Sequence, residues 1–281
     1  MNETGVDPRS VRESPIAGSW YPGDRKALLS AVQQYLQAVP EQRLVGEVVA
    51  LVSPHAGYLY SGQVAAHAYA VLARKKYDVV AVISPSHRYY GGDLLVTSRA
   101  YYRTPLGLVE VAHDLVSQVG GQVALTFVNR DDEHSLEIQL PFLQVQLGAF
   151  RLLPIMMQDQ SYGVAKALGD ALAKTLADKR ALLVASTDLS HFHPYERAVA
   201  LDRRALAAIE RFDAEGLDRD VASGRSEACG YGAVVSVLVA ARALGADRVT
   251  VLRYANSGDV TGDRTRVVGY GAAAITRSQE T

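Results

Sequence analysis

Residues 51–62 of the chain read LVSPHAGYLYSG, an apolar run that stops at Ser-Pro and is followed at once by a histidine. Residues 82–93, VISPSHRYYGGD, repeat this arrangement. Proline cannot donate a ladder hydrogen bond, and it biases the residue before it toward extended geometry. Each segment is therefore predicted to be a buried strand that ends at its proline and leaves the sheet in a fixed direction, carrying a titratable ring with it.

Strand-like and helix-like segments alternate along the rest of the chain. Apolar residues at helical spacing predict helices over 24–39, 62–73, 132–147, 163–177, 194–212 and 230–245. Strands are predicted over 48–54, 78–85, 93–98, 123–128, 151–157, 181–187, 248–257 and 266–275, with room for a hairpin between the third and the fourth. Pro141 is expected to kink or restart its helix. The alternation predicts an α/β fold, a single domain over residues 1–281 with a mostly parallel or mixed central sheet covered by helices on both faces.

Composition limits the class of protein. The chain has 281 residues, of which 48% are hydrophobic and 21% charged, as is usual for a soluble globular protein. Its net charge of -1 gives no reason to expect nucleic acid or an anionic membrane as a partner. No apolar stretch approaches the roughly 20 residues that cross a bilayer, and the polar start resembles no secretory signal, so a cytoplasmic location is expected. The single cysteine, Cys229, excludes an internal disulfide.

Polar side chains gather where predicted strands end. Ligands of open α/β sheets bind beyond the carboxyl ends of the strands, in the loops that lead to the next helix. The two Ser-Pro segments fall there, and so do DLSHFHP at 188–194 and NRDDEHSLE at 129–137. These junctions hold five of the seven histidines: His55, His87, His134, His191 and His193.

Imidazoles gathered at one sheet edge are typical of a divalent transition-metal site. Two histidines with one anionic ligand would hold a metal on one face and leave positions open for substrate or oxygen. The spacing does not choose the anionic ligand among Asp188, Glu133, Glu137 and the thiolate of Cys229. Any one of the histidines taken alone is better explained as a structural residue with satisfied hydrogen bonds, and it is their joint position that favours a metal.

The chain resembles the MEMO family, whose bacterial and archaeal members are often called AmmeMemoRadiSam system protein B. The motifs that carry the resemblance run in order from AGSWYPGD (17–24) through SPHAGYLYSG, ISPSH, DDEHSLEIQLPFL and ASTDLSHF to CGYGA (229–233). The family is similar in fold to the class III extradiol ring-cleaving dioxygenases of the LigB type, which use non-haem Fe(II). The resemblance therefore implies a LigB-dioxygenase-like fold.

The resemblance also implies a metal site formed by His55, His87 and Cys229. The dioxygenases have a glutamate where this family has its cysteine. His191 falls where those enzymes place an acid/base histidine, and Asp188 is close by, so these two residues are the expected catalytic pair. Iron is the first expectation for the metal, with zinc or copper as alternatives, because a thiolate is a softer ligand than a carboxylate.

Four further residues are expected to support or line the site: Glu133, His134, Glu137 and Tyr58. Positions 134 and 137 lie one turn apart on the predicted helix and would share a face. A structural alternative exists here too, because Asp131 and Asp132 suit the N-terminus of that helix. The only tryptophan, Trp20, either walls the pocket or anchors the N-terminal segment.

Three classes of function are consistent with these residues. The first is a metal-dependent oxidoreductase of dioxygenase type that acts on an unknown small molecule. The second is a metal-binding or redox scaffold without turnover, whose protein partners would be of the AMMECR and radical SAM type that the family's naming implies. The third is a metal-dependent hydrolase. One fold hosts many chemistries, so fold similarity does not decide among them.

Overall fold

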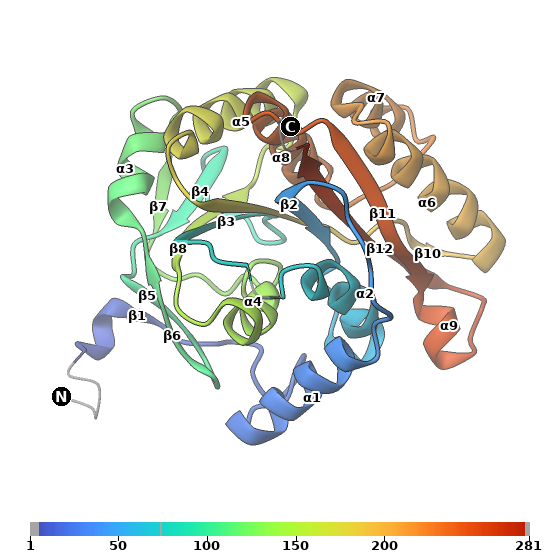
Figure 1. The fold of residues 1–281 in the computed structure, drawn as a ribbon, viewed down its shortest axis with the longest axis horizontal. Helices are drawn as coiled ribbons and strands as arrows, with labels where there is room; N and C mark the ends of the chain where they lie inside the picture. The colour runs from blue at the N-terminus through green and yellow to red at the C-terminus, as the bar shows by residue number, and fades with distance from the viewer. Residues whose placement is uncertain (1–5, 74, 279–281) are drawn as a thin grey trace.

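The middle of the sheet is built from the uninterrupted apolar runs, which can be buried on both faces only where helices cover them. The computed structural model describes residues 6–73 and 75–278, and these residues form a mixed sheet of 12 strands (Figure 1). Four parallel strands form its centre, in the order β8 (Arg151–Met157), β3 (Val79–Pro85), β9 (Ala181–Ser186) and β2 (Glu47–Ser53). Every residue of β3 is buried.

Further strands extend the sheet on either side. Next to β2 lies the antiparallel β12 (Val267–Arg277), which also pairs with β11 (Arg248–Asn256) and β10 (His191–His193). Next to β8 lies β6 (Gly107–Val111), which forms a hairpin with β5 (Tyr101–Thr104), and β5 pairs with β1 (Val11–Arg12). β4 (Leu94–Thr97) pairs with β8 and with β7 (Thr126–Val128). The hairpin expected between the third and fourth predicted strands is present.

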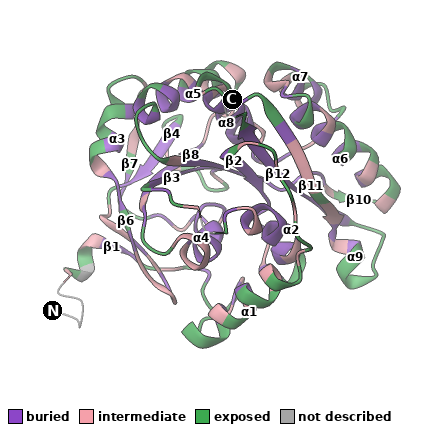
Figure 2. Ribbon diagram, viewed as in Figure 1, coloured by how far each residue is buried: buried purple, intermediate pink, exposed green. Residues whose placement is uncertain are grey.

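Helices cover both faces of this sheet, and Figure 2 shows its centre as buried. α1 (Arg25–Gln37), α2 (Tyr58–Ala70) and α4 (Leu140–Leu147) pack on one face. α3 (His113–Gly120), α5 (Tyr162–Leu176) and α8 (Tyr231–Ala243) cover the other, and α7 (Ala214–Ala222) packs between α8 and α6 (Tyr195–Glu210). Three short elements complete the fold: η1 (Pro8–Ser10), η2 (Glu137–Gln139) and α9 (Ser257–Thr261). The predicted α/β architecture is confirmed.

The helix predicted over 132–147 is wrong in its first half. The side chain of Asp131 accepts a hydrogen bond from the backbone N–H of Glu133, and Glu133 accepts from the N–H groups of His134 and Ser135. Such local side-chain acceptors offer the backbone an alternative to helical hydrogen bonds. The α-helix begins only at α4, with Pro141 in its first turn, where a missing N–H costs nothing. Residues 134 and 137 therefore do not share a helical face.

Three helices, α3, α7 and α9, were not predicted. They are short, at 8, 9 and 5 residues, so each has too few turns for a helical pattern to be recognised in the sequence. Among the described residues, none of the helices combines the length and the hydropathy needed to cross a membrane.

Candidate metal centre

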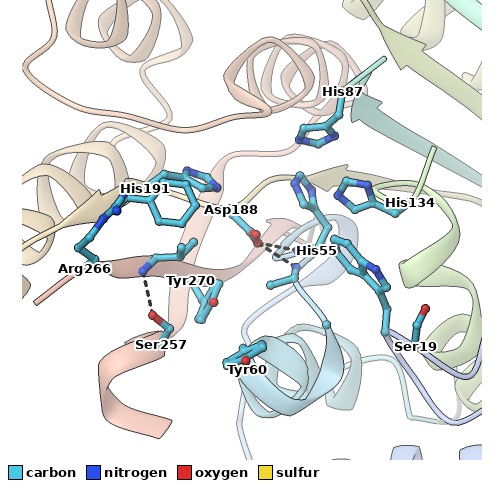
Figure 3. Close-up of a pocket in the computed structure, with 15 residues that line it drawn as sticks. Ser19, His55, Tyr60, His87, His134, Asp188, His191, Ser257, Arg266 and Tyr270 are labelled. Carbon is cyan, nitrogen blue, oxygen red and sulfur yellow. Dashed lines mark hydrogen bonds between the residues drawn. The ribbon is translucent and has the colours of Figure 1, made fainter. Parts of the chain in front are cut away.

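A cavity of about 540 Å³ opens at the carboxyl ends of the central strands. His55 and His87 follow β2 and β3 directly, while Asp188 and His191 follow β9. All four line the cavity, with His55 and His87 on one side and His191 on the other (Figure 3). They meet because β2, β9 and β3 are parallel neighbours, so their carboxyl ends share one edge of the sheet.

Three potential ligand atoms converge at this edge. His55, His87 and Cys229 each offer one atom, and the three atoms lie within 4.8 Å of one another. The Sγ atom of Cys229 is 3.1 Å from Nε2 of His55. The rings of His55 and His87 stand nearly perpendicular, with centroids 5.2 Å apart. Two imidazoles and a thiol in this arrangement suit a transition metal, because nitrogen and sulfur are the donors that such metals prefer.

Burial sets the protonation of two of these groups. The ring of His55 is only 2% exposed, and its burial, together with the nearby imidazoles of His134 and His87, holds the pKa of His55 well below its usual value. The ring is therefore neutral at pH 7, the form that binds a metal. Burial also raises the pKa of the Cys229 thiol, so that a thiolate forms there only when a cation compensates its charge.

Glu133 orients the second histidine. Its carboxylate accepts hydrogen bonds from the backbone N–H of His87 and, at 3.0 Å, from Nδ1 of the same residue. Burial alone would raise the pKa of Glu133, but its hydrogen bonds with His87 and the backbone and its proximity to His134 lower the pKa to about 2. An ionised carboxylate can only accept, so the proton of His87 is on Nδ1 and Nε2 is left for a metal.

Glu133, His87 and His134 form a second group whose ligand atoms lie within 4.8 Å of one another. Here Oε1 of Glu133 already accepts from Nδ1 of His87 and from the N–H groups of His134 and Ser135. An oxygen whose lone pairs are engaged in this way is a poor metal ligand. His134 is best described as a neutral wall of the cavity, since burial lowers its pKa to about 4 and its ring lies 4.2 Å from that of Trp20.

The loop that carries Cys229 is held against the end of β9. The Sγ atom accepts from the N–H of Asp188 at 3.3 Å, and the N–H of Gly230 donates to Oγ1 of Thr187 at 2.9 Å. A Cβ atom on Gly230 would lie 2.3 Å from the carbonyl oxygen of Ser186, so the glycine of CGYG is required by close approach to this strand. Gln160 closes the loop by donating to the carbonyl of Cys229 at 2.7 Å.

Asp188 is buried beneath the cavity and binds the backbone after β2. Its Oδ1 accepts from the N–H of His55 at 2.7 Å and from that of Ala56 at 3.3 Å. Burial raises the pKa of Asp188 to about 7, although these two hydrogen bonds oppose the shift. The expected pairing of this carboxylate with His191 is not among the hydrogen bonds of the described residues, because its oxygen is directed to the His55 backbone.

His191 lines the cavity from an irregular strand. β10 pairs with β12 through a bulge, and Phe192 within it has a positive φ of 62°, which is uncommon for a residue with a bulky side chain. Buried Asp202 fixes the residue before this strand by accepting a hydrogen bond from the N–H of Ser190 at 2.8 Å. At the other end of the strand, Glu227 binds Nε2 of His193 at 2.8 Å. Burial lowers the pKa of His191, which leaves its ring neutral at pH 7.

Two residues expected to support the site lie behind it. Glu137 is fully buried and binds Arg12, Ser14 and Tyr21, so it anchors the N-terminal segment instead of contacting the candidate metal-binding residues. The hydroxyl of Tyr58 donates to the backbone carbonyl of residue 138 at 2.9 Å, within the hydrophobic core. Of the two alternatives for Trp20, the structure supports the first, because Trp20 lines the cavity, while its neighbour Tyr21 is the buried residue that anchors this segment.

Several residues that hold the site had not been singled out in the sequence. These are Gln139, Gln160, Ser186 and Glu227. Gln139 and Ser186 lie within the motifs DDEHSLEIQLPFL and ASTDLSHF, but each of the four acts on a partner distant in the chain, which no local pattern identifies.

The sequence profile of a family described as "Memo-like protein" matches residues 12–274. The chain is 37% identical over 269 residues to a MEMO1 family protein of Methanosarcina mazei, a match that covers 94% of this chain and 99% of that protein. It is 34% identical over 270 residues to a MEMO1 family protein of Nitrosopumilus maritimus, covering 93% and 98%.

In fold, the chain is similar to the crystal structure of the uncharacterized protein JW3007 from Escherichia coli K12. The TM-score is 0.53, the sequence identity is 14%, and the match covers 81% of this chain and 99% of that one. At this level of identity the similarity concerns the fold alone. The similarity to LigB-type dioxygenases that the resemblance implied stays a prediction.

Proposed function

The chain belongs to the Memo-like family, and from this premise we propose that it binds a transition metal through His55, His87 and Cys229 and acts on a small molecule in the adjacent cavity. The observation that carries the proposal is the convergence of these three residues within 4.8 Å at the edge of the cavity. The activity favoured is that of a metal-dependent oxidoreductase of dioxygenase type.

The donor set fits a metal on two counts. Nδ1 of His55 and Nδ1 of His87 are both engaged in hydrogen bonds with other residues, which leaves Nε2 of each ring. The three potential ligand atoms lie within 4.8 Å of one another, and both rings line the cavity. A bound iron would supply redox chemistry and Lewis acidity toward a substrate oxygen. Iron is the metal proposed, with zinc or copper as the alternatives that the thiolate favours.

The chain's own residues have separate roles in this proposal. His191 holds or takes a proton at a substrate hydroxyl, because its neutral ring faces the cavity and an imidazole pKa suits transfer in either direction. Asp188 lies in the same cavity with a pKa of about 7, so both of its protonation states are accessible near neutrality. Trp20 and Tyr60 wall the cavity and limit the access of water to the reacting groups.

A scaffold without turnover is the second candidate. The observation in its favour is the exposure of two apolar side chains at the cavity, Tyr60 at 42% and Phe192 at 59%, which a protein partner would cover. Its partners would be of the AMMECR and radical SAM type, and the metal and Cys229 would serve a redox role. A cytoplasmic location accompanies both candidates, because a reducing compartment keeps a single thiol free. A metal-dependent hydrolase is the third candidate.

Metal analysis of protein purified anaerobically, without added metal, tests the proposal. The parent should carry a stoichiometric transition metal, and Cys229→Ser and His87→Ala should lose it. His113→Ala is the matched control, since His113 belongs to α3 and does not line the cavity. Retention of the parent's metal content by both site variants would rule the site out.

One further measurement tests the sulfur ligand, and another separates the candidate functions. In the cobalt-substituted protein, a thiolate-to-metal charge-transfer band that disappears in Cys229→Ser would identify the sulfur ligand. O2 consumption with catechol-type substrates that is lost in His191→Ala, while the metal stays bound, would support the oxidoreductase. A native zinc protein without oxygen chemistry would favour the scaffold or the hydrolase.

A further inference from the structure

We infer that Ser186 is a positioning residue for the metal centre, which keeps the proton of His55 on Nδ1 and thereby leaves Nε2 open, and that Gln139 holds Ser186 in this role. The metal itself rests on the proposed function. The position of the His55 proton does not depend on that proposal, because it is a property of the metal-free chain.

The orientation of the Gln139 amide is determined by its surroundings. Its Nε2 donates to the carbonyl oxygen of Pro54 at 3.0 Å and to Oγ of Ser186 at 2.7 Å. Its Oε1 accepts from the hydroxyl of Tyr69 at 2.7 Å. Rotating the amide by half a turn would place Oε1 against the Pro54 carbonyl, and two acceptors do not bond. Gln139 therefore presents a donor to Ser186.

The single hydroxyl proton of Ser186 is already used. Oγ of Ser186 donates to the carbonyl oxygen of Ser135 at 2.6 Å, and this carbonyl belongs to a fully buried residue. No other hydrogen bond to this oxygen occurs among the described residues, so withdrawing the proton would leave a buried acceptor unpaired. Of the two lone pairs of Ser186, one accepts from Gln139. The other faces Nδ1 of His55 at 3.0 Å.

His55 must therefore donate from Nδ1, because Ser186 has no proton left to give. A neutral imidazole carries one proton, so its Nε2 is an acceptor. That nitrogen is the one that lies 3.1 Å from the sulfur of Cys229. His87 reaches the same state by another route, since it donates from Nδ1 to the carboxylate of Glu133. The Nδ1–H of His55 thus donates to a neutral hydroxyl, and the Nδ1–H of His87 donates to a carboxylate.

The hydrogen bond made by the remote nitrogen of a metal-binding histidine fixes the ring's orientation, and its loss typically costs 10–100-fold in metal affinity. A purely structural role for Ser186 would predict a loss of stability instead, with the His55 proton and the metal affinity unchanged. Ser84 provides a matched control at the end of β3. It is a fully buried serine whose Oγ has no hydrogen-bond partner in the described part of the chain.

The first test reads the proton directly in metal-free protein labelled with 15N-histidine. Long-range 1H–15N spectra at neutral pH should show His55 in the Nδ1–H form. Ser186→Ala should give a mixture of the two neutral forms, and Ser186→Thr, which keeps the hydroxyl, should restore the parent spectrum. Gln139→Leu should give a smaller shift toward the Nε2–H form than Ser186→Ala, because Ser186 loses the donor on one lone pair but keeps its hydrogen bond to the Ser135 carbonyl. Finding the His55 proton on Nε2 in the parent overturns the inference.

The second test measures Zn²⁺ affinity by chelator competition. Ser186→Ala should weaken binding by about 10–100-fold, and Ser84→Ala should leave it unchanged. Parent-like affinity and a parent-like tautomer in folded Ser186→Ala would also overturn the inference. If the parent binds no metal at all, the proposed function fails while the spectra still decide the proton's position. If Ser186→Ala does not fold, the parent spectrum and Gln139→Leu decide it.

Discussion

The sulfur of Cys229 lies 3.1 Å from Nε2 of His55, although 174 residues separate the two in the chain. The contact arises because His55 follows β2, and β2 pairs in parallel with β9, whose end receives the loop that carries Cys229. The position of each atom therefore depends on neighbours that hold the two loops, and those neighbours can be changed one at a time.

Glu133→Gln should weaken Zn²⁺ binding by about 10–100-fold. The amide keeps the size of the side chain, but its neutral oxygen is a weaker acceptor than a carboxylate for the Nδ1–H of His87. Its NH2 group would also face one of the backbone N–H donors that the carboxylate satisfies. Chelator competition at neutral pH measures the change. An affinity within twofold of the parent's would contradict the role assigned to Glu133.

In contrast to Glu133→Gln, Glu137→Gln should lower the free energy of unfolding and leave the Zn²⁺ affinity unchanged. Glu137 shares the buried guanidinium of Arg12 with Asp131, and neutralising one partner of a buried ion pair costs about 3 kcal/mol in the free energy of unfolding. Urea denaturation should show this loss, while Zn²⁺ affinity stays that of the parent. A loss of affinity comparable with that of Glu133→Gln would show that Glu137 acts on the metal centre after all.

Gly230→Ala should reduce Zn²⁺ binding as severely as Cys229→Ser. The added methyl group would lie 2.3 Å from the backbone oxygen of Ser186, so the loop must move and take the sulfur away from His55. Gly163→Ala is the control, since a methyl group there meets no atom within 4 Å. Circular dichroism should show both variants folded. Normal zinc binding by Gly230→Ala would contradict the close packing of this loop.

Asp220→Asn should lower stability at pH 7 but not at low pH. Hydrogen bonds from Arg204 and Arg225 lower the pKa of Asp220 from 3.8 to about 2. A carboxyl whose pKa is lower in the folded state stabilises it above the unfolded pKa, and this contribution disappears as the pH falls toward the folded value. The variant should lose about 1–2 kcal/mol at pH 7, with the difference shrinking below about pH 4. Urea denaturation across this range measures it, and a pH-independent difference would contradict it.

Arg266→Gln should weaken the binding of small carboxylates in the cavity. The guanidinium of Arg266 lies over the ring of Phe192, 5.2 Å from its centroid, and lines the cavity opposite His55 and His87 (Figure 3). Quenching of Trp20, the only tryptophan, reports binding there. Benzoate should bind about fivefold more tightly than benzamide, and the variant should abolish this preference. Equal binding of the two compounds by the parent would contradict it.

Much of the fold followed from local patterns. The Ser-Pro ends of β2 and β3 were predicted from proline geometry, and the boundaries agree closely with the structure. The helix expected over 132–147 was wrong in its first half, because the side chains of Asp131 and Glu133 accept hydrogen bonds from the backbone N–H groups there. Competition of this kind depends on which carboxylates are held in place by the rest of the fold, and helical periodicity contains no information about it.

The sequence alone determined the alternation of strands and helices, because that follows from residue type and order, and its motifs determined the family, whose resemblance implies His55, His87 and Cys229 as the expected ligands. Only the tertiary structure decided what holds those ligands. Ser186, Gln139 and Glu133 reach them across neighbouring elements, and a hydrogen bond depends on where two atoms lie in space, which the order of residues does not state.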